Sequence, residues 1–205
     1  GLRRVDVLGA SHDALDHAGG AGSIADLVPV ERRVASGVAL DPLGFVERCR
    51  RGVRWSWDGV SFEWLHPGEE SLPKDNDRSC VLRVQAGRHS VLLTGDVERL
   101  AEAEIVATGT LGPVDVLLVP HHGSRTSSTA AFVAATRPRW ALVPSGHRNR
   151  WGFPKPDVVA RWEAAGAEVL VGSSTGAIEF ELHPQRGLSP PQLSRPAQQR
   201  PWRDR

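Results

Sequence analysis

The sequence predicts an α/β fold whose strands and helices pack in layers. From about residue 114 onward, apolar strand patterns alternate with helical patterns, which is typical of layered α/β domains. Before residue 95, two stretches alternate apolar and polar residues around short turn sequences, which predicts β-hairpins. A chain of 205 residues is long enough to bury a core of this kind in one domain.

The amino-terminal half is predicted to contain mostly strands. Residues 53–65 (VRWSWDGVSFEWL) alternate on both sides of Asp58-Gly59, a dipeptide that favours a two-residue hairpin turn. In the second hairpin, apolar strands flank Ala86-Gly87-Arg88-His89. We expect strands at 5–8, 80–84 and 90–94, a short helix at 24–28 and a polar loop at 67–79.

The carboxyl-terminal half is predicted to alternate helices and strands. Residues 97–108 are rich in Ala and Glu, which favour a helix, and a helix at 157–166 is closed by Gly166. The other elements are strands at 114–120, 139–145 and 167–171 and a helix at 127–136.

The last residues have a different composition. From Pro184 onward the chain is rich in Pro, Gln and Arg, with five Arg and one Asp. Such a composition buries too little apolar surface to order itself. We therefore expect one domain over 1–183 and a flexible basic tail over 184–205, which is more typical of a solvated terminus than of a binding arm.

Composition excludes several classes of protein. The formal net charge of +1 gives no overall attraction to nucleic acid or membrane, so binding a polyanion needs a local patch. No apolar run of about 18 residues and no signal peptide are present. The chain begins with Gly1 and contains no Met, so we expect a piece of a longer protein. Cys49 and Cys80 form no CxxC pair, which argues against a zinc–thiolate site. The spacing is compatible with a disulfide between them, but we expect two separate buried thiols.

The stretch SHDALDHAGG places two histidines and two aspartates directly after a predicted strand. These residues are His12, Asp13, Asp16 and His17. A strand-to-helix loop can bend several short side chains onto one cation, whereas a straight strand aims them in alternating directions. Imidazole nitrogens and carboxylate oxygens together suit Zn²⁺, Mn²⁺ or Fe²⁺ better than Ca²⁺ or Mg²⁺. A loop with two His and two Asp is, by itself, more often a solvated cap than a metal site. The metal interpretation therefore depends on the other motifs.

Three later stretches also place polar residues at strand ends, where an α/β layer gathers a site. LLTGDVE ends a strand at Asp96, and VPHHGSRTSS ends the next strand at His121 and His122. A third cluster includes Asn76 and Asp77, just before a strand. This recurrence favours a shared cation site over unrelated polar residues.

The motifs together carry a family resemblance. The order HxxxDH, NDxSCVL, LLTGD, VPHHGSxTSS and NRxGxP resembles the metallo-β-lactamase-like domain of the ComEC family of competence proteins, over residues 3–182. The resemblance implies a four-layer αββα sandwich that lacks its first strands, since these would precede residue 3. One sheet would then have an exposed edge, so we expect reduced stability or self-association.

The resemblance also implies the site residues. Asp96 would bridge two cations, and Asn76 or Asp77 stands where related hydrolases have another histidine. Asp16 would orient or deprotonate a water, and His122 or His121 would assist the leaving oxygen. The implied cofactor is one or two ions of Mn²⁺ or Zn²⁺. The implied ligands are His12, Asp16, His17, Asp77, Asp96, His121 and His122.

Two departures from the family pattern concern the metal site. The first loop of the family usually reads HxDxDH, but its third position here is Ala14, so Asp13 would have to swing in to compensate. Phe153 and Lys155 stand where relatives often have histidines, and His147 is a nearby candidate substitute. Such a site should bind metal weakly. The candidate phosphate-binding residues are Ser124, Arg125, Arg148, Arg150 and Lys155.

For function, the resemblance implies a nuclease that degrades the non-imported DNA strand during transformation. The domain would belong to an inner-membrane channel protein, on its periplasmic face, with single-stranded DNA, the rest of that channel and the competence machinery as partners. The alternative is a catalytically degenerate module that binds DNA and guides it to the same channel. Cleavage of thioesters, lactones or β-lactams, as elsewhere in the superfamily, fits VPHHGSRTSS less well.

Overall fold

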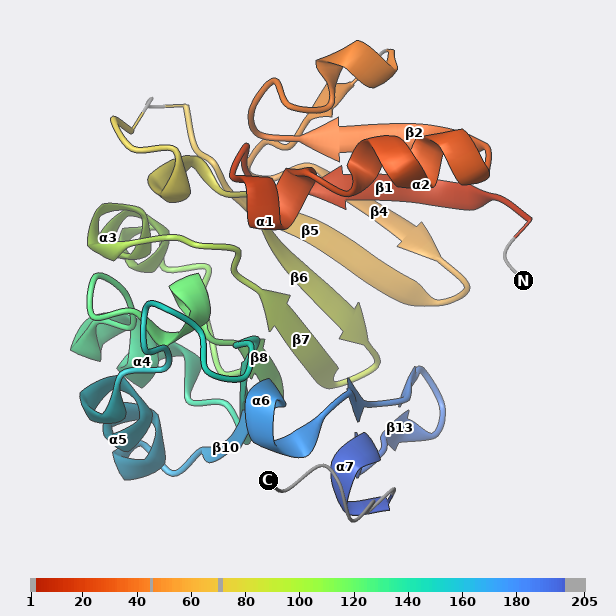
Figure 1. Ribbon diagram of the computed structural model, residues 1–205. Helices are drawn as coiled ribbons and strands as arrows, with labels where there is room; N and C mark the ends of the chain where they lie inside the picture. Colours follow the sequence, from red (N-terminus) through yellow and green to blue (C-terminus); the bar gives the residue numbers. More distant parts are fainter. Residues whose placement is uncertain (1–2, 45, 70–71, 198–205) are drawn as a thin grey trace.

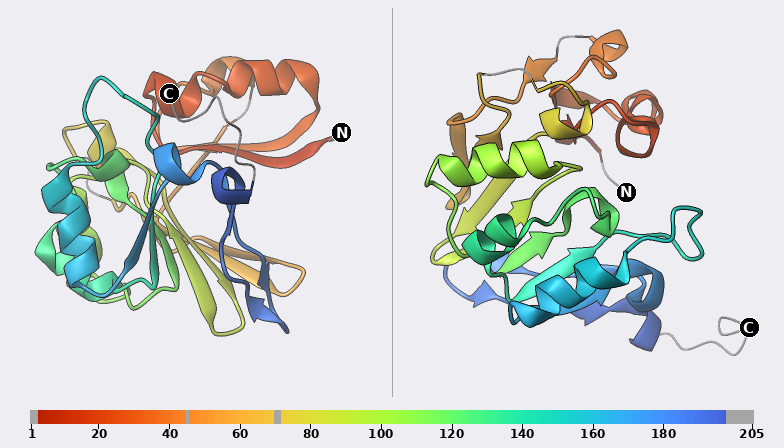
Figure 2. Two further views of the ribbon diagram at one scale, coloured as in Figure 1. Left: turned by 60° about the horizontal axis from the view of Figure 1, so that its bottom comes forward. Right: turned by 90° about the vertical axis from the view of Figure 1, so that its left-hand side faces the viewer.

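The molecule is built around two main β-sheets packed face to face, with helices on their outer faces (Figure 1), and the described residues also form two small two-stranded sheets. The structure is a computed structural model that describes residues 3–44, 46–69 and 72–197. Helices α1 and α2 lie over the small sheet, and α3, α4 and α5 cover the large one; the views in Figure 2 show the same four layers. This arrangement is the αββα sandwich that the family resemblance implies.

The small sheet contains the first strand and the opening motif. Its strands β1 (Val5–Ala10), β2 (Val30–Ala35) and β3 (Glu47–Arg48) are parallel and lie in that order. Helices α1 (Leu15–Ala18) and α2 (Ala21–Leu27) pack on it through small side chains such as Ala18 and Ala21. Within the described residues, β1 pairs only with β2 and is therefore an edge strand. Self-association through this edge stays a prediction.

The large sheet has seven strands in the order β10-β9-β8-β7-β6-β5-β4. Its first half is antiparallel, from β4 to β7, and its second half is parallel, from β7 to β10. The strands are β4 (Arg54–Trp57), β5 (Val60–His66), β6 (Val81–Ala86), β7 (His89–Leu93), β8 (Val116–Leu118), β9 (Trp140–Val143) and β10 (Glu168–Val171).

Both predicted hairpins are present. Asp58 and Gly59 have φ angles of 47° and 79°, the positive values that a two-residue hairpin turn requires at both positions. The second turn is shorter than expected, because Ala86 already pairs with His89. Gly87, with φ of 58°, allows the chain to reverse within two residues.

Three helices bury the outer face of the large sheet. They are α3 (Arg99–Ala107), α4 (Ala130–Thr136) and α5 (Pro156–Ala164). Phe132 and Trp162 pack with Leu117 in the main core. Helix α4 begins three residues later than predicted, because the buried Glu102 carboxylate accepts hydrogen bonds from the Ser128 and Thr129 amides and holds them outside the helix. None of the described helices is long and apolar enough to span a bilayer.

The two cysteines form a disulfide, so the expectation of two separate thiols is wrong. Cys49 follows β3 and Cys80 precedes β6, and their Cα atoms lie 5.9 Å apart. The bond therefore joins the small sheet to the large one. Val34 and Trp64 pack around it. Spacing along the chain could not reveal this pairing, which depends on how the sheets face each other.

Part of the segment after β10 packs on the large sheet. Leu188 and Leu193, which were expected in a flexible tail, pack with Trp140 on the inner face of the large sheet. The boundary expected at 183/184 stays a prediction, and residues 198–205 lie outside the described part of the chain. The elements here are α6 (Gly172–Thr175), β11 (Ile178–Glu179), β12 (Leu182–His183), β13 (Gly187–Leu188), β14 (Gln192–Leu193) and α7 (Ser194–Ala197).

Candidate metal centre

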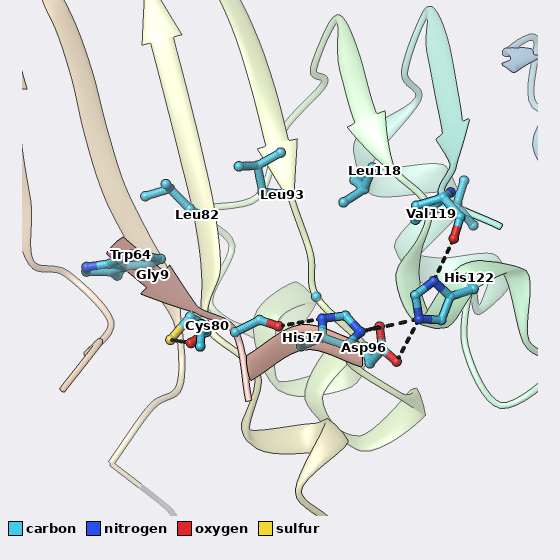
Figure 3. Close-up of a pocket in the computed structure, with 14 residues that line it drawn as sticks. Gly9, His17, Trp64, Cys80, Leu82, Leu93, Asp96, Leu118, Val119 and His122 are labelled. Carbon is cyan, nitrogen blue, oxygen red and sulfur yellow. Dashed lines mark hydrogen bonds and ion pairs between the residues drawn. The ribbon is translucent and has the colours of Figure 1, made fainter. Parts of the chain in front are cut away.

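The imidazole and carboxylate groups of three distant motifs meet where the two sheets adjoin. The small sheet contributes the loop after β1 together with α1, and the large sheet contributes the segments after β7 and β8. Figure 3 shows His17, Asp96 and His122 in contact, with Asp96 between the two imidazoles.

Asp96 is the centre of the cluster and is 5% exposed. Its Oδ1 lies 3.2 Å from His17 Nε2, and its Oδ2 lies 3.4 Å from His122 Nε2. The two Nε2 atoms are themselves 3.3 Å apart. Groups from the first and third motifs therefore converge on one point, as the sequence predicts for a shared site.

His12 has a buried donor atom that is suited to bind a cation. Its ring is fully buried, and Nε2 has no hydrogen-bond partner within the described residues. Its Nδ1 is held by the hydroxyls of Ser11, at 3.0 Å, and Ser79, at 3.3 Å. Because a buried polar atom without a partner is costly, the free Nε2 fits a cation bound beside Asp96.

His122 is fixed in the tautomer that a metal ligand needs. Its Nδ1 donates a hydrogen bond of 2.8 Å to the Pro144 carbonyl, so in the neutral ring the lone pair is on Nε2, which faces Asp96. The hydrogen bond with Asp96 raises the pKa of His122 to about 9, although burial lowers it.

The electrostatics of Asp96 and His12 differ in direction. Burial alone would raise the pKa of Asp96, but hydrogen bonds with His122 and His17 outweigh it and hold the pKa well below its usual range. Burial, and then the charge of His17, lower the pKa of His12. The centre therefore holds a carboxylate and a neutral imidazole side by side, a donor set suited to a divalent cation.

The backbone at the histidine pair is strained. His121 and His122 have φ angles of 49° and 54°, in the left-handed region that only a few per cent of residues other than Gly adopt. Each such residue costs about 1–3 kcal/mol unless its surroundings compensate. This turn places both imidazoles beside Asp96.

His121 lies farther from the centre than His122. Its Nε2 is 3.9 Å from Asp96 Oδ2, while its Nδ1 is 3.3 Å from Glu98 Oε1 and 3.1 Å from Thr126 Oγ1. Glu98 thus orients His121, and it was missed in the sequence. The sequence feature that could have identified Glu98 is its position two residues after Asp96, at the end of the same strand.

Asp16 lies at the mouth of the cluster, with its side chain 60% exposed. Its Oδ2 is 3.4 Å from His122 Nε2 and 3.9 Å from His17 Nε2. Two sets of three groups can therefore hold a cation: His12, His17 and Asp96, and Asp16, His17 and His122.

Two carboxylates expected near the metal point elsewhere. Asp77 Oδ1 accepts hydrogen bonds from the Glu98 and Ala101 amides, at 2.9 Å and 3.2 Å, and so caps the start of α3. Asp13 does not supply the metal ligand that Ala14 lacks. Its carboxylate instead accepts hydrogen bonds from the Val38 and Ala39 amides of another loop. In both cases the carboxylate is hydrogen-bonded to backbone amides and does not face the metal centre.

Of the other positions involved in the departures from the family pattern, some line the cavity over the cluster and one does not. Ala14 and Phe153 line the cavity over the cluster, together with Asn76. His147, the candidate substitute, is exposed and lies outside this lining. The structure therefore brings His12, Asp16, His17, Asp96, His121 and His122 together, and leaves Asp77 out.

The candidate phosphate-binding residues separate into two groups. Ser124 is buried and bonds Thr126, and Arg125 forms an ion pair with Asp157. The other three, Arg148, Arg150 and Lys155, lie on the segment between β9 and α5, beside the cavity.

Two cavities meet at the cluster. One, of about 620 Å³, is lined by polar groups and by Trp151 and Phe153. The other, of about 290 Å³, is mostly apolar and lies between the sheets. Figure 3 shows Leu82, Leu93 and Leu118 on adjacent strands beside it.

Comparison with known proteins identifies this arrangement. The family model described as the metallo-beta-lactamase superfamily matches residues 1–147. The chain belongs to this superfamily. Members of the superfamily bind metal ions, in agreement with the cluster around Asp96. CmlA, a diiron β-hydroxylase from Streptomyces venezuelae, has a TM-score of 0.59 and 16% identity over 83% of this chain and 44% of its own, which supports the fold alone.

Curated relatives confirm the resemblance to competence proteins. Competence protein ComA of Neisseria gonorrhoeae is 38% identical over 186 residues, which are 89% of this chain and 26% of ComA. Recombination protein 2 of Haemophilus influenzae is 40% identical over 176 residues, which are 86% of this chain and 22% of that protein. The chain thus spans about a quarter of the length of the curated relatives it matches.

Proposed function

We propose that this metallo-beta-lactamase domain hydrolyses phosphodiester bonds of single-stranded DNA with the help of divalent cations, in a DNA-uptake protein. The observation that carries the proposal is the convergence of His17, Asp96 and His122 beside the unpartnered Nε2 of buried His12. Residues from both sheets are needed to form this arrangement.

The proposed cofactor is Mn²⁺ or Zn²⁺, as one or two ions. Mixed imidazole and carboxylate donors suit these ions. A cation held here supplies Lewis-acid chemistry: it makes a bound water more acidic and offsets negative charge at the phosphate. His12, His17 and Asp96 would hold one ion, and Asp16 and His122 would contribute to a second, because the single lone pair of His17 Nε2 can serve only one ion.

The remaining chemistry falls to side chains at the cavity. Asp16 is exposed at the cavity mouth, where its carboxylate would orient the attacking water and accept its proton. His121, or His122 where its Nε2 does not hold an ion, would assist departure of the leaving oxygen. Glu98 would keep the His121 ring in position through Nδ1.

The proposed substrate and setting rest on similarity and charge. The relatives include proteins named for competence and recombination, and Arg148, Arg150 and Lys155 give the cavity a cationic side. The partners would be the rest of the parent channel and the competence machinery. The parent protein would lie in the inner membrane with this domain on the periplasmic face, a location that the Cys49–Cys80 disulfide supports, since such bonds persist in oxidising compartments.

The test is hydrolysis of labelled single-stranded DNA by the purified chain in the presence of Mn²⁺ or Zn²⁺. Cleavage should stop with a chelator and in Asp96→Ala. A matched control is Asp26→Ala, which removes an exposed aspartate on α2 outside the cluster. Equal cleavage by wild type and Asp96→Ala would refute the proposal.

The second candidate is a degenerate module that binds and guides DNA without cleaving it. Its support is that Ala14 and Phe153, at family ligand positions, line the cavity. This module would bind DNA in a salt-sensitive manner that chelators do not affect. Metal analysis separates the two candidates: two tightly held ions favour the hydrolase, and none after soaking favours the module.

A further inference from the structure

The segment between β9 and α5 carries a feature that the metal centre does not explain. It projects from the body of the molecule as a loop (Figure 2) and borders the larger cavity with Trp151 and Phe153. Trp151 is 54% exposed. Among the described residues, neither ring belongs to an apolar core cluster. A large aromatic side chain outside the core at the edge of a cavity is typical of a binding surface.

The rings are aligned with each other and with the metal centre. Phe153 and His122 have ring centroids 6.5 Å apart and planes inclined by 19°. Trp151 and Phe153 have centroids 6.4 Å apart and planes inclined by 11°. Three nearly parallel ring planes thus lead from a cluster imidazole outward to solvent.

Cations accompany these rings. The Arg150 guanidinium lies 4.4 Å from the Trp151 ring centroid, and Lys155 Nζ lies 5.3 Å from that of Phe153. Arg148 is exposed on the same segment, and residues 144–156 contain no acidic residue. Aromatic faces interleaved with cations are the combination that binds single-stranded nucleic acid, whose bases stack while its phosphates need positive charge.

The loop is held in shape before any ligand binds. Asn149 Oδ1 accepts a hydrogen bond of 2.9 Å from the Phe153 amide, and Asn149 Nδ2 donates one of 2.7 Å to the Phe153 carbonyl. The Lys155 amide donates a hydrogen bond of 2.9 Å to the carbonyl of Gly123, which connects the loop to the turn that contains His121 and His122. A pre-formed platform loses less entropy when a ligand binds.

We propose that Trp151 and Phe153 form a stacking platform for unpaired bases of a single strand, while Arg148, Arg150 and Lys155 contact its phosphates. The platform would deliver the strand to the cavity beside His122. This proposal rests on the proposed function, because it names how that site would select its substrate. A flat membrane surface fits less well, since the ring planes run toward the cluster.

The test compares two oligonucleotides of equal charge. One is a fluorescent thymidine strand of about 12 nucleotides, within the range of known single-strand sites, and the other is an abasic strand of the same length. Binding is measured by anisotropy with EDTA present and at fixed salt. Wild type should prefer the thymidine strand, and Trp151→Ala should weaken its binding by about 5- to 100-fold while leaving abasic binding unchanged.

Two variants serve as controls. Trp151→Phe, which keeps an aromatic face, should recover most of the preference for bases. Trp57→Ala removes another exposed tryptophan, on β4 and away from the cavity, and should bind like wild type. Circular dichroism verifies that each variant is folded.

The outcomes also separate this proposal from the hydrolase. If wild type binds both strands equally, or Trp151→Ala keeps the preference for bases, the platform is refuted even where DNA is cleaved. If the preference depends on Trp151 and no cation supports cleavage, the platform stands and the hydrolase fails. Trp151-dependent binding to anionic phospholipid vesicles without any preference for bases would overturn the platform in favour of a membrane contact.

Discussion

The two halves of the candidate metal centre differ in how firmly the fold holds them. Asp96 and His122 follow strands of a seven-stranded sheet whose core includes Phe132 and Trp162. His12 and His17 depend on a three-stranded sheet whose own core consists largely of alanines. The large half is therefore organised by its own packing.

The small half relies on links across the interface. The Cys80 amide donates to the Ser11 carbonyl at 2.8 Å, and the Ser79 hydroxyl contacts both His12 Nδ1 and the Asp96 amide. The disulfide adds a covalent link at the same place. The site is therefore only as stable as the junction between the two sheets.

The largest expected effect is on stability, through the disulfide. It closes a loop spanning a sequence separation of 31, so reduction should lower the free energy of unfolding by about 3–4 kcal/mol. Urea unfolding with and without reductant measures this change. The double variant Cys49→Ala/Cys80→Ala should be equally unstable in both conditions. An unchanged midpoint after thiol titration has shown the bond to be broken would contradict the prediction.

The next effect compares one carboxylate from each half. Asp96→Asn should weaken cation binding by at least about 100-fold, because the charge between His17 and His122 is lost. Asp16→Asn should cost about 10-fold or less, since its side chain is 60% exposed and lies at the mouth. Titration calorimetry with Mn²⁺ and Zn²⁺ measures both. Equal losses would show that the halves contribute alike.

A smaller effect concerns the orientation of His121. Glu98→Ala should reduce cation affinity or DNA cleavage by about 10- to 100-fold, as expected when the partner of a site histidine is removed. Glu98→Gln keeps an acceptor for Nδ1 and should recover most of the loss. Similar defects in both variants would indicate that the negative charge of Glu98 beside His121 matters more than an acceptor atom at that position.

The smallest effect should strengthen the weak half. Ala14 is the N-cap of α1, and its methyl group cannot cap a helix. Ala14→Asn and Ala14→Asp should each raise the free energy of unfolding by about 1 kcal/mol. Only Ala14→Asp places an added carboxylate beside the cavity, so only it should also tighten cation binding. Tightening by both variants would assign the gain to order in α1 alone.

The sequence was sufficient to predict both hairpins, the alternation of helices and strands after residue 114, and the recurrence of polar residues at strand ends, but it did not predict β2 or β3. Alternation around Asp58-Gly59 was sufficient for the first hairpin, because turn geometry is local. His12, His17, Asp96 and His122 could be grouped because strand ends of layered α/β folds gather at one edge.

Which side chains face that edge depends on contacts between segments that are far apart in the sequence. Asp77 and Asp13 were taken by backbone amides from other segments, and Cys49 met Cys80 across the interface. The alignment of Trp151 with Phe153 depends on a loop held by Asn149. The physical reason is the same in each case: a side chain turns toward the partner that packing brings to it, and spacing along the chain does not reveal that partner.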